Sequence, residues 1–334
     1  MKHRYIFLAL AMLILILSAI GTSAQSAYRF SAPHTYKNLT IFLIYGKDEA
    51  GKGNVMTLQE AMERKLFVVY ETSNVNELEV ENLSKEFDVF IQAGDIVKGG
   101  RQDRVLAVSI IIPARSGRIK IESFCVESGR WSKRGAEDSG KFTSSNDRVV
   151  TRDLKIAANA SRSQSEVWAK VSDAQAKLER NVGAPVRAAE SASSLQLSLE
   201  NGKVAATVDE YVKNLTGIVN GRTDIIGYAF AINGKLNSVD IYASNALFKK
   251  LWQKNLKATA TEAVAESRSV RLAEPVKAKD VEDFIERADK AKPRERVSPA
   301  GATVTTRDDG TNLLVEARDS KTKAVVHRSY IKKD

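Results

Sequence analysis

The chain has 334 residues, 43% of them hydrophobic and 28% charged, with a formal net charge of +10, which is a composition typical of globular proteins. One cysteine and three histidines exclude a disulfide within the chain and argue against a histidine-rich metal site. The length is sufficient for one large domain or two smaller ones.

Residues 1–24 have the pattern of a secretory signal peptide. Lys2 and Arg4 precede the apolar run Tyr5–Ile20, and the small residues Thr22 and Ala24 occupy the positions that signal peptidase prefers. The apolar run is shorter than the roughly 20 residues that a spanning helix needs. We therefore expect export to the periplasm or the extracellular space, with no stable membrane span after cleavage. The alternative is a retained membrane anchor.

The N-terminal half is predicted to be rich in strands. The apolar run Leu39–Tyr45 predicts a strand, and the capping box Thr57–Glu60 predicts the start of a short helix. The run Val105–Ile112 is apolar on both faces except for Ser109, which predicts one strand covered on both sides. Further strands are predicted at Leu66–Glu71, Glu77–Asn82, Phe87–Ile91 and Arg118–Glu127.

The second half mixes helices and strands. The polar segment Ser132–Asn159 predicts a long loop, and Gln164–Arg180 has apolar residues at helical spacing. A second capping box, Thr207–Glu210, predicts another helix start. Two apolar runs around Asn233 and Gly234 predict a β-hairpin from Ile225 to Tyr242. A helix is expected from Asn245 onward.

The C-terminal region begins with a charged linker, continues with a short amphipathic helix that ends at Pro293, and finishes as a β-meander over Val297–Ile331. Strands and helices do not alternate strictly, so we predict an α+β fold. Its N-terminal half would hold a central antiparallel sheet, and its second half would hold helices and a hairpin. The predicted units are the signal peptide at 1–24, a main domain at 25–268, and the linker helix with the meander at 269–334.

Two clusters, Gly94–Arg104 and Phe124–Trp131, are rich in residues whose side chains or backbone could bind a ligand or take part in catalysis. Paired glycines let a ligand approach the backbone closely, and arginines bind phosphate or carboxylate groups. From Lys98 to Arg134 there are nine basic residues against three acidic ones, a charge excess that attracts anions. The alternative is a tight turn with surface arginines. The candidate ligand-binding residues are Gly99, Gly100, Arg101, Gln102, Arg104, Arg130 and Trp131.

Three residues are candidates for catalysis: Asp103, Glu127 and Cys125. Glu127 shares its strand face with Cys125, and a buried carboxylate must be paired, with Arg104 or Arg130 as the obvious partner. Such a carboxylate is either a general acid or base with a shifted pKa or one half of a salt bridge that locks two strands. Cys125 is either a nucleophile, which requires a thiolate, or a packed core residue.

No cofactor or metal ion is indicated. The predicted partner is an anionic small molecule or another protein. The basic residues are not interleaved with stacking aromatic residues, which argues against nucleic acid as a partner.

Three segments, Gly94–Arg104, Ile112–Gly117 and Phe124–Trp131, together resemble the ARG and rhodanese-phosphatase-superfamily-associated protein family, in which ARG stands for ADP-ribosylglycohydrolase. The similarity extends to Gln164–Trp168 and to the hairpin and helix from Ile225 to Leu256. It covers most of residues 37–265. The family name implies an association with ADP-ribose or phosphate chemistry in some members, and it implies a role for the motif residues of both clusters.

Three hypotheses follow. The first, which we prefer, is an exported module that binds a ligand or partner through the Gly99–Arg104 turn. The second is a hydrolase that acts on a phosphate-like or ADP-ribose-like substrate. The third is a structural envelope protein in which the motif stabilises the fold.

Overall fold

The computed structural model describes residues 28–48, 54–267, 274–319 and 321–333. The predicted signal peptide and the predicted domain boundary at residue 268 therefore lie outside the described residues. The strands are β1 (Arg29–Phe30), β2 (His34–Tyr36), β3 (Leu39–Tyr45), β4 (Val55–Thr57), β5 (Phe67–Asn74), β6 (Glu77–Asn82), β7 (Asp88–Ile91), β8 (Asp95–Gly99), β9 (Arg104–Leu106), β10 (Ile110–Ile112), β11 (Arg118–Cys125), β12 (Phe142–Arg148), β13 (Ile225–Ile232), β14 (Lys235–Tyr242), β15 (Pro293–Val297), β16 (Thr303–Asp308), β17 (Asn312–Arg318) and β18 (Val325–Lys332). The helices are α2 (Leu58–Glu63), α3 (Arg152–Ile156), the π-helix η1 (Ala157–Ser161), α4 (Gln164–Val182), α5 (Leu195–Leu199), α6 (Gly202–Leu215), the 3-10 helix η2 (Thr216–Val219), α7 (Asn245–Ala265) and α8 (Ala278–Lys290).

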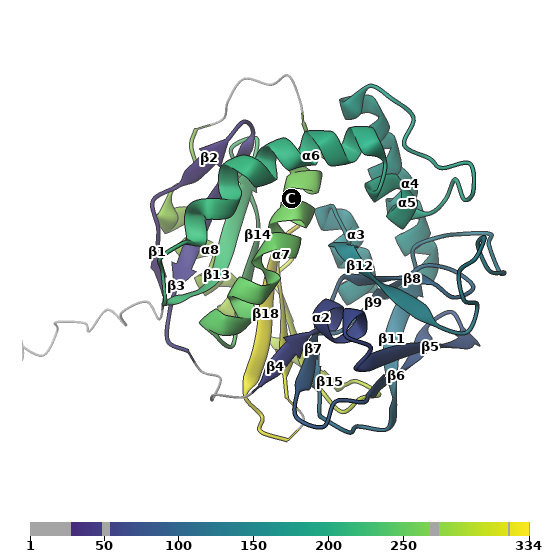
Figure 1. Cartoon of the computed structure of the whole chain (residues 1–334). Coiled ribbons are helices and arrows are strands. Elements are labelled where there is room, and N and C mark those ends of the chain that lie inside the picture. Colours follow the sequence, from purple (N-terminus) through teal and green to yellow (C-terminus); the bar gives the residue numbers. More distant parts are fainter. Residues whose placement is uncertain (1–27, 49–53, 268–273, 320, 334) are drawn as a thin grey trace, which may run out of the picture.

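These strands form three sheets (Figure 1). The largest has the order β1-β3-β13-β14-β18-β17-β16-β15, with β2 paired to β3. A second sheet has the order β12-β8-β9-β11-β6-β5, and a third has the order β10-β7-β4. The pairings are antiparallel except for β4 with β7. The predicted α+β class and the C-terminal meander are confirmed, and β18 joins this meander to β14 of the large sheet.

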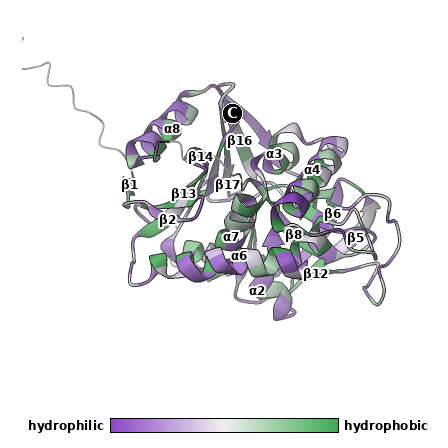
Figure 2. Cartoon of the chain, turned by 90° about the horizontal axis from the view of Figure 1, so that it is seen from above, coloured by the Kyte–Doolittle hydropathy of each residue, from purple (hydrophilic) through white to green (hydrophobic). Residues whose placement is uncertain are grey.

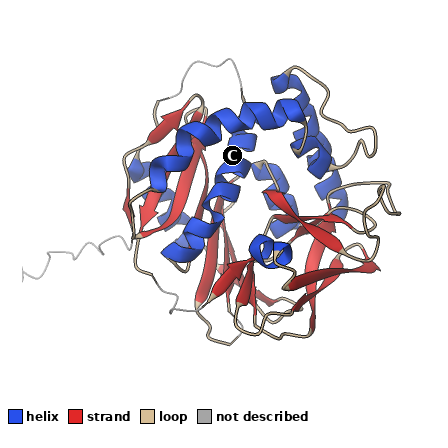
Figure 3. Ribbon diagram, viewed as in Figure 1, coloured by secondary structure: helices blue, strands red, loops and turns tan. Residues whose placement is uncertain are grey.

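Helices cover both faces of the large sheet. Figure 2 shows α8 on one side of β13 and β14, and α6 and α7 on the other. The face toward α8 packs Tyr330 and Leu314 against Phe284 and Ile285 of that helix. The opposite face packs Phe230 against α7 within a larger core that also includes α4 and α6. Figure 3 shows α6 and α4 along the top of the molecule, α7 near its centre, and the smaller sheets at the lower right.

The hairpin between β13 and β14 is confirmed. Asn233 and Gly234 have φ values of 53° and 73°, the left-handed conformation that a two-residue hairpin turn requires. The first capping box is also confirmed, because the Thr57 hydroxyl accepts from the backbone N–H of Glu60 while the Glu60 carboxylate accepts from that of Thr57.

One strand prediction was wrong, and one strand was not predicted. The run from Val105 to Ile112 is two strands, because residues 107–109 leave the β9 ladder and the chain continues as β10 in another sheet. Segment 95–99, for which no strand was predicted, is strand β8. The break at residues 107–109 lets the Ser109 hydroxyl accept from the backbone N–H of Ala93, at 3.0 Å.

Two predictions in the second half also failed. The segment from residue 132 to 159 includes β12, α3 and part of η1 rather than one loop, because its polar groups find partners inside the fold, as Asp147 does with Lys257 at 2.8 Å. Thr207 does not start a helix. Helix α6 already begins at Gly202 with Asn201 as its N-cap.

Candidate functional site

The predicted corner between β8, β9 and β11 is a buried charge network. The Glu127 carboxylate accepts from Arg130 Nε and Nη2, both at 2.7 Å, and from the backbone N–H of Asp103 at 2.9 Å. It also lies 3.4 Å from Arg134 Nη1. Burial alone would raise the pKa of Glu127, but hydrogen bonds from Arg130, Ser191 and the Asp103 backbone hold it below its usual value. The carboxylate therefore stays charged.

Asp103 is equally well paired. Its two oxygens accept from both terminal nitrogens of Arg134, each at 3.0 Å, from the backbone N–H of Gly99 at 3.0 Å, and from the Ser194 hydroxyl at 2.8 Å. Asp103 and Glu127 are both fully buried. Sequence reasoning had not singled out Arg134. Both oxygens of the carboxylate have hydrogen-bond partners and neither is exposed to solvent. Asp103 therefore has the arrangement of a buried salt bridge that holds neighbouring strands together.

The two adjacent glycines, Gly99 and Gly100, allow the chain to pack closely against itself. Gly99 and Gly100 have φ values of 113° and 55°, a region that favours glycine. A Cβ on Gly100 would come within 2.3 Å of the Phe142 ring. The Gly100 N–H donates to the carbonyls of Asp138 and Lys141, so this N–H already has partners within the chain. Gln102 in the same turn is buried as well.

Arg104 and Cys125 lie together on neighbouring strands β9 and β11. The Arg104 guanidinium pairs with Glu71 at 3.1 Å and contacts the Cys125 sulfur. Cys125 is a free, buried cysteine. Burial raises the pKa of the Cys125 thiol to about 11, although the Arg104 charge opposes the shift. The thiol is therefore protonated at neutral pH, which disfavours nucleophilic attack.

Arg101 and Trp131 form the accessible edge of this corner. Trp131 is 44% exposed, and the guanidinium carbon of Arg101 lies 5.5 Å from the centre of its ring. Arg130, in contrast, is turned toward Glu127 and the carbonyls of Gly99 and Gly100. The structure thus brings the predicted site residues together, but most of them face one another.

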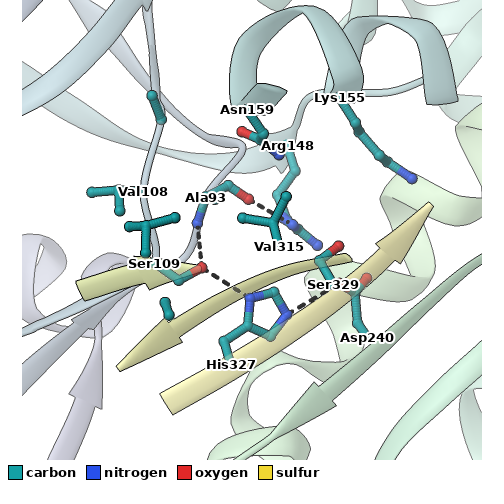
Figure 4. Close-up of a pocket in the computed structure, with 13 residues that line it drawn as sticks. Ala93, Val108, Ser109, Arg148, Lys155, Asn159, Asp240, Val315, His327 and Ser329 are labelled. Atoms are coloured by element: carbon teal, nitrogen blue, oxygen red, sulfur yellow. Dashed lines mark hydrogen bonds and ion pairs between the residues drawn. The ribbon is translucent and has the colours of Figure 1, made fainter. Parts of the chain in front are cut away.

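A second cluster lies where the three sheets meet, around a cavity of about 20 Å³ (Figure 4). Its floor is the large sheet, which contributes Asp240 from β14 and His327 from β18. Ser109 projects into it from the break between β9 and β10. The remaining polar walls are Arg148 at the end of β12, Lys155 on α3 and Asn159 on η1.

Three of these side chains form a hydrogen-bonded chain. Ser109 Oγ lies 2.9 Å from His327 Nδ1, and His327 Nε2 lies 3.1 Å from Asp240 Oδ1. Burial alone would raise the pKa of Asp240, but the hydrogen bond from His327 and the charges of Arg148 and Lys155 hold it well below its usual range. The Tyr242 ring stacks on the His327 ring with centroids 4.7 Å apart, which fixes the plane of the imidazole.

Arg148 is a buried cation without a carboxylate partner. Its terminal nitrogens donate to Asn255 Oδ1 at 2.6 Å and to the carbonyl of Ala93 at 2.8 Å. Within the described part of the chain it forms no ion pair, and its Nε–H has no hydrogen-bond partner. Asn159 Oδ1, on the same cavity, is also buried and unpaired. Buried polar groups are rarely left without partners, so these atoms indicate a place for a ligand or water.

The local backbone supports this wall of the cavity. Thr151 precedes α3 with φ 69°, which is strained for a β-branched residue, and its hydroxyl caps the helix at Leu154. Helix α3 then widens into the π-helix η1 that carries Asn159, a form often found at functional sites. Lys155 is held by Glu262 of α7 at 2.9 Å.

Sequence reasoning did not assemble this cluster, although one signal was present. Ser109 is the polar exception in an otherwise apolar run, and such an exception can mark a buried hydroxyl with a specific partner. His327 lies near the end of the chain, 218 positions away, and Asp240 and Arg148 have no local motif. Their meeting depends on sheet pairings that short-range patterns do not reveal.

No helix in the described part of the chain is long and apolar enough to cross a lipid bilayer. Among the described residues, no three His, Cys, Asp or Glu side chains are grouped so that they could hold a metal ion. A model of the ARG and rhodanese-phosphatase-superfamily-associated protein domain matches residues 27–331. No curated protein and no solved structure gives a significant match.

Proposed function

Because the chain belongs to the ARG and rhodanese-phosphatase-superfamily-associated protein family, whose name gives an association and no reaction, we propose a function from the site itself. The protein is an exported binding module that holds an oxyanion group of a small ligand in the cavity beside His327. The single observation that carries this proposal is the buried guanidinium of Arg148, which has no ion pair within the described chain and an unpaired Nε–H at the cavity.

Hydrogen-bond donors dominate the cavity wall. Arg148 offers its Nε–H and Lys155 has ammonium hydrogens beyond the one used by Glu262, whereas the unpaired atom of Asn159 is the acceptor Oδ1. Of the two cations that line the cavity, Lys155 is already paired with Glu262, so Arg148 is the cation that would meet the acceptor oxygens of a ligand. A cavity of about 20 Å³ holds roughly one or two water molecules. A phosphate or sulfate group is larger than this, so its binding requires the side chains that line the cavity to move apart.

Ligand binding is tested by thermal shift with inorganic phosphate, sulfate, ribose 5-phosphate and ADP-ribose. At a hundredfold excess over Kd, we expect the melting temperature of the wild type to rise by on the order of 5 °C. Arg148→Met should abolish the shift, and Arg148→Lys should weaken it because the bidentate geometry is lost. Each variant is compared with its own ligand-free melting temperature.

The matched control is Arg118→Met, which removes an arginine whose side chain is 57% exposed and pairs with Glu79 on the surface. This variant should keep the full ligand shift. The proposal fails if no oxyanion shifts the wild type, or if Arg148→Met responds as strongly as Arg118→Met.

The Gly99–Arg104 turn is a second candidate binding site for the anion. Fewer of its residues are accessible to a ligand than the sequence indicated. A specific observation favours it, since Trp131 is exposed with Arg101 lying against its ring, an arrangement that can hold a planar anion. The same ligand screen separates the two places. Loss of the shift in Arg101→Ala or Trp131→Ala, with Arg148→Met unaffected, would assign the ligand to this edge.

Export is proposed on the sequence of residues 1–24 alone. The expected result is a mature protein that begins at Gln25 and is recovered outside the cytoplasm. N-terminal sequencing of the protein from fractionated cells checks this directly. A mature chain that keeps Met1 and remains with the membrane fraction would support the retained anchor instead.

A further inference from the structure

In the hydrogen-bonded chain of Ser109, His327 and Asp240, each donor and acceptor can be assigned. Asp240 is anionic at neutral pH because the Asp240 pKa is held low, so His327 Nε2 carries the proton that it shares with Asp240 at 3.1 Å. In the neutral imidazole with its proton on Nε2, Nδ1 presents a lone pair. It lies 2.9 Å from Ser109 Oγ, so the Ser109 hydroxyl donates its proton to the imidazole.

The Ser109 oxygen retains a lone pair with which it can react. A hydroxyl has two lone pairs, and the backbone N–H of Ala93 occupies one of them at 3.0 Å. The second remains available, and Ser109 lines the cavity. A hydroxyl that donates to an oriented imidazole, whose other nitrogen is held by a carboxylate, is the arrangement of an activated serine nucleophile.

Two positively charged side chains line the same cavity as Ser109. Arg148 and Lys155 line the same cavity, and Figure 4 shows them on the wall above Ser109 and His327. Donors placed in advance in a water-poor cavity stabilise a developing oxyanion more strongly than donors in water do. The cluster therefore contains a nucleophile, a base with its orienting carboxylate, and cationic donors.

We infer that Ser109 is a nucleophile for a small phosphate ester whose phosphoryl group occupies this cavity. The inference rests on the proposed oxyanion site. Ser109 Oγ forms a bond to phosphorus while the bond from phosphorus to the ester oxygen breaks. The hydroxyl proton passes to His327 Nδ1 and then to the departing alkoxide. Water, deprotonated by His327, later releases phosphate from Ser109.

The test uses methanesulfonyl fluoride, a small reagent that places sulfonyl oxygens at a reactive serine and loses fluoride. Intact mass should show one methanesulfonyl group on the wild type, and peptide mapping should place it on Ser109. His327→Asn should label at least ~100-fold more slowly, which is the lower range for loss of a general base. In parallel, wild-type hydrolysis of p-nitrophenyl phosphate should be lost in Ser109→Ala.

Two variants keep the outcome interpretable. Ser329→Ala removes another hydroxyl on the same cavity that has no bond to His327 in the hydrogen-bond chain, and it should label like the wild type. Ser109→Cys retains a reactive group in case Ser109→Ala folds poorly. Its new thiol beside His327 should react with iodoacetamide while Cys125 stays protected.

The inference is overturned if the wild type is not labelled, if the label lies on another residue, or if His327→Asn reacts as fast as the wild type. These outcomes are separable from failure of the proposed function. A phosphate-induced thermal shift that depends on Arg148, together with an unreactive Ser109, would leave a binding site without a nucleophile.

Discussion

Replacing Glu127 with alanine is expected to lower the free energy of unfolding by about 3–5 kcal/mol, the range for breaking a buried ion pair by removing one partner. The change removes one acceptor from each of Arg130 and Arg134 and leaves the backbone N–H of Asp103 without its acceptor. Glu127 is fully buried, so water cannot replace the lost hydrogen bonds without local opening. Urea denaturation followed by tryptophan fluorescence measures the effect.

The control is Glu79→Ala, which removes the carboxylate of a surface pair with Arg118. Exposed pairs contribute at most about 1 kcal/mol. Similar losses for Glu79→Ala and Glu127→Ala would contradict a structural role for the network and would return Glu127 to the list of accessible functional groups.

The stability difference between the wild type and Glu127→Ala should depend on pH in a defined direction. The pKa of Glu127 is lowered in the folded protein, so its ionised form stabilises the fold above the unfolded pKa of about 4.3. This contribution is lost as the pH falls through the folded pKa. The stability difference between wild type and Glu127→Ala should therefore be full at pH 7 and should shrink below about pH 4.

Gly227→Ala is expected to cost about 3 kcal/mol or more, at the upper end for overpacking. A Cβ on Gly227 would lie 2.3 Å from the carbonyl oxygen of Asp240 and 3.0 Å from the Cα of Ile241. Both are backbone atoms of the paired strand β14, so no side-chain rotation can relieve the contact. The strands must separate where Asp240 meets His327.

Two measurements check this result. Thermal or urea unfolding gives the stability loss, and the methanesulfonyl fluoride rate reports whether Asp240 and His327 remain aligned. Gly202→Ala is the matched control, because a Cβ there meets no atom within 4 Å. A Gly227→Ala variant as stable as Gly202→Ala would show that β13 and β14 are looser than the register indicates.

Local patterns predicted most of the elements. The hairpin turn at Asn233 and Gly234, the apolar stripe of α4 and the meander each depend on residues close in sequence. The expected pairing of Glu127 with an arginine was partly right, since Arg130 is its partner. Arg104, the other candidate, pairs with Glu71 of β5 instead, because strand neighbours decide which charges meet.

What the sequence did not reveal is non-local. The segment that contains Arg148 and Lys155 looked like a loop because it is polar, yet its charges are neutralised or hydrogen-bonded by α7, through Lys257, Asn255 and Glu262. Ser109 and His327 meet across three sheets. Polar composition predicts exposure only when no buried partner exists, and partners far apart in sequence are invisible to short-range patterns.

The position of β18 has a kinetic consequence. This strand is inserted between β14 and β17, although it follows all the other described strands in the sequence. A nascent chain thus carries an unpaired edge on β14 until residues 325–332 have been synthesised, and long-range strand pairing of this kind is slow. Truncation before residue 325 would remove the strand that joins the two halves of the large sheet.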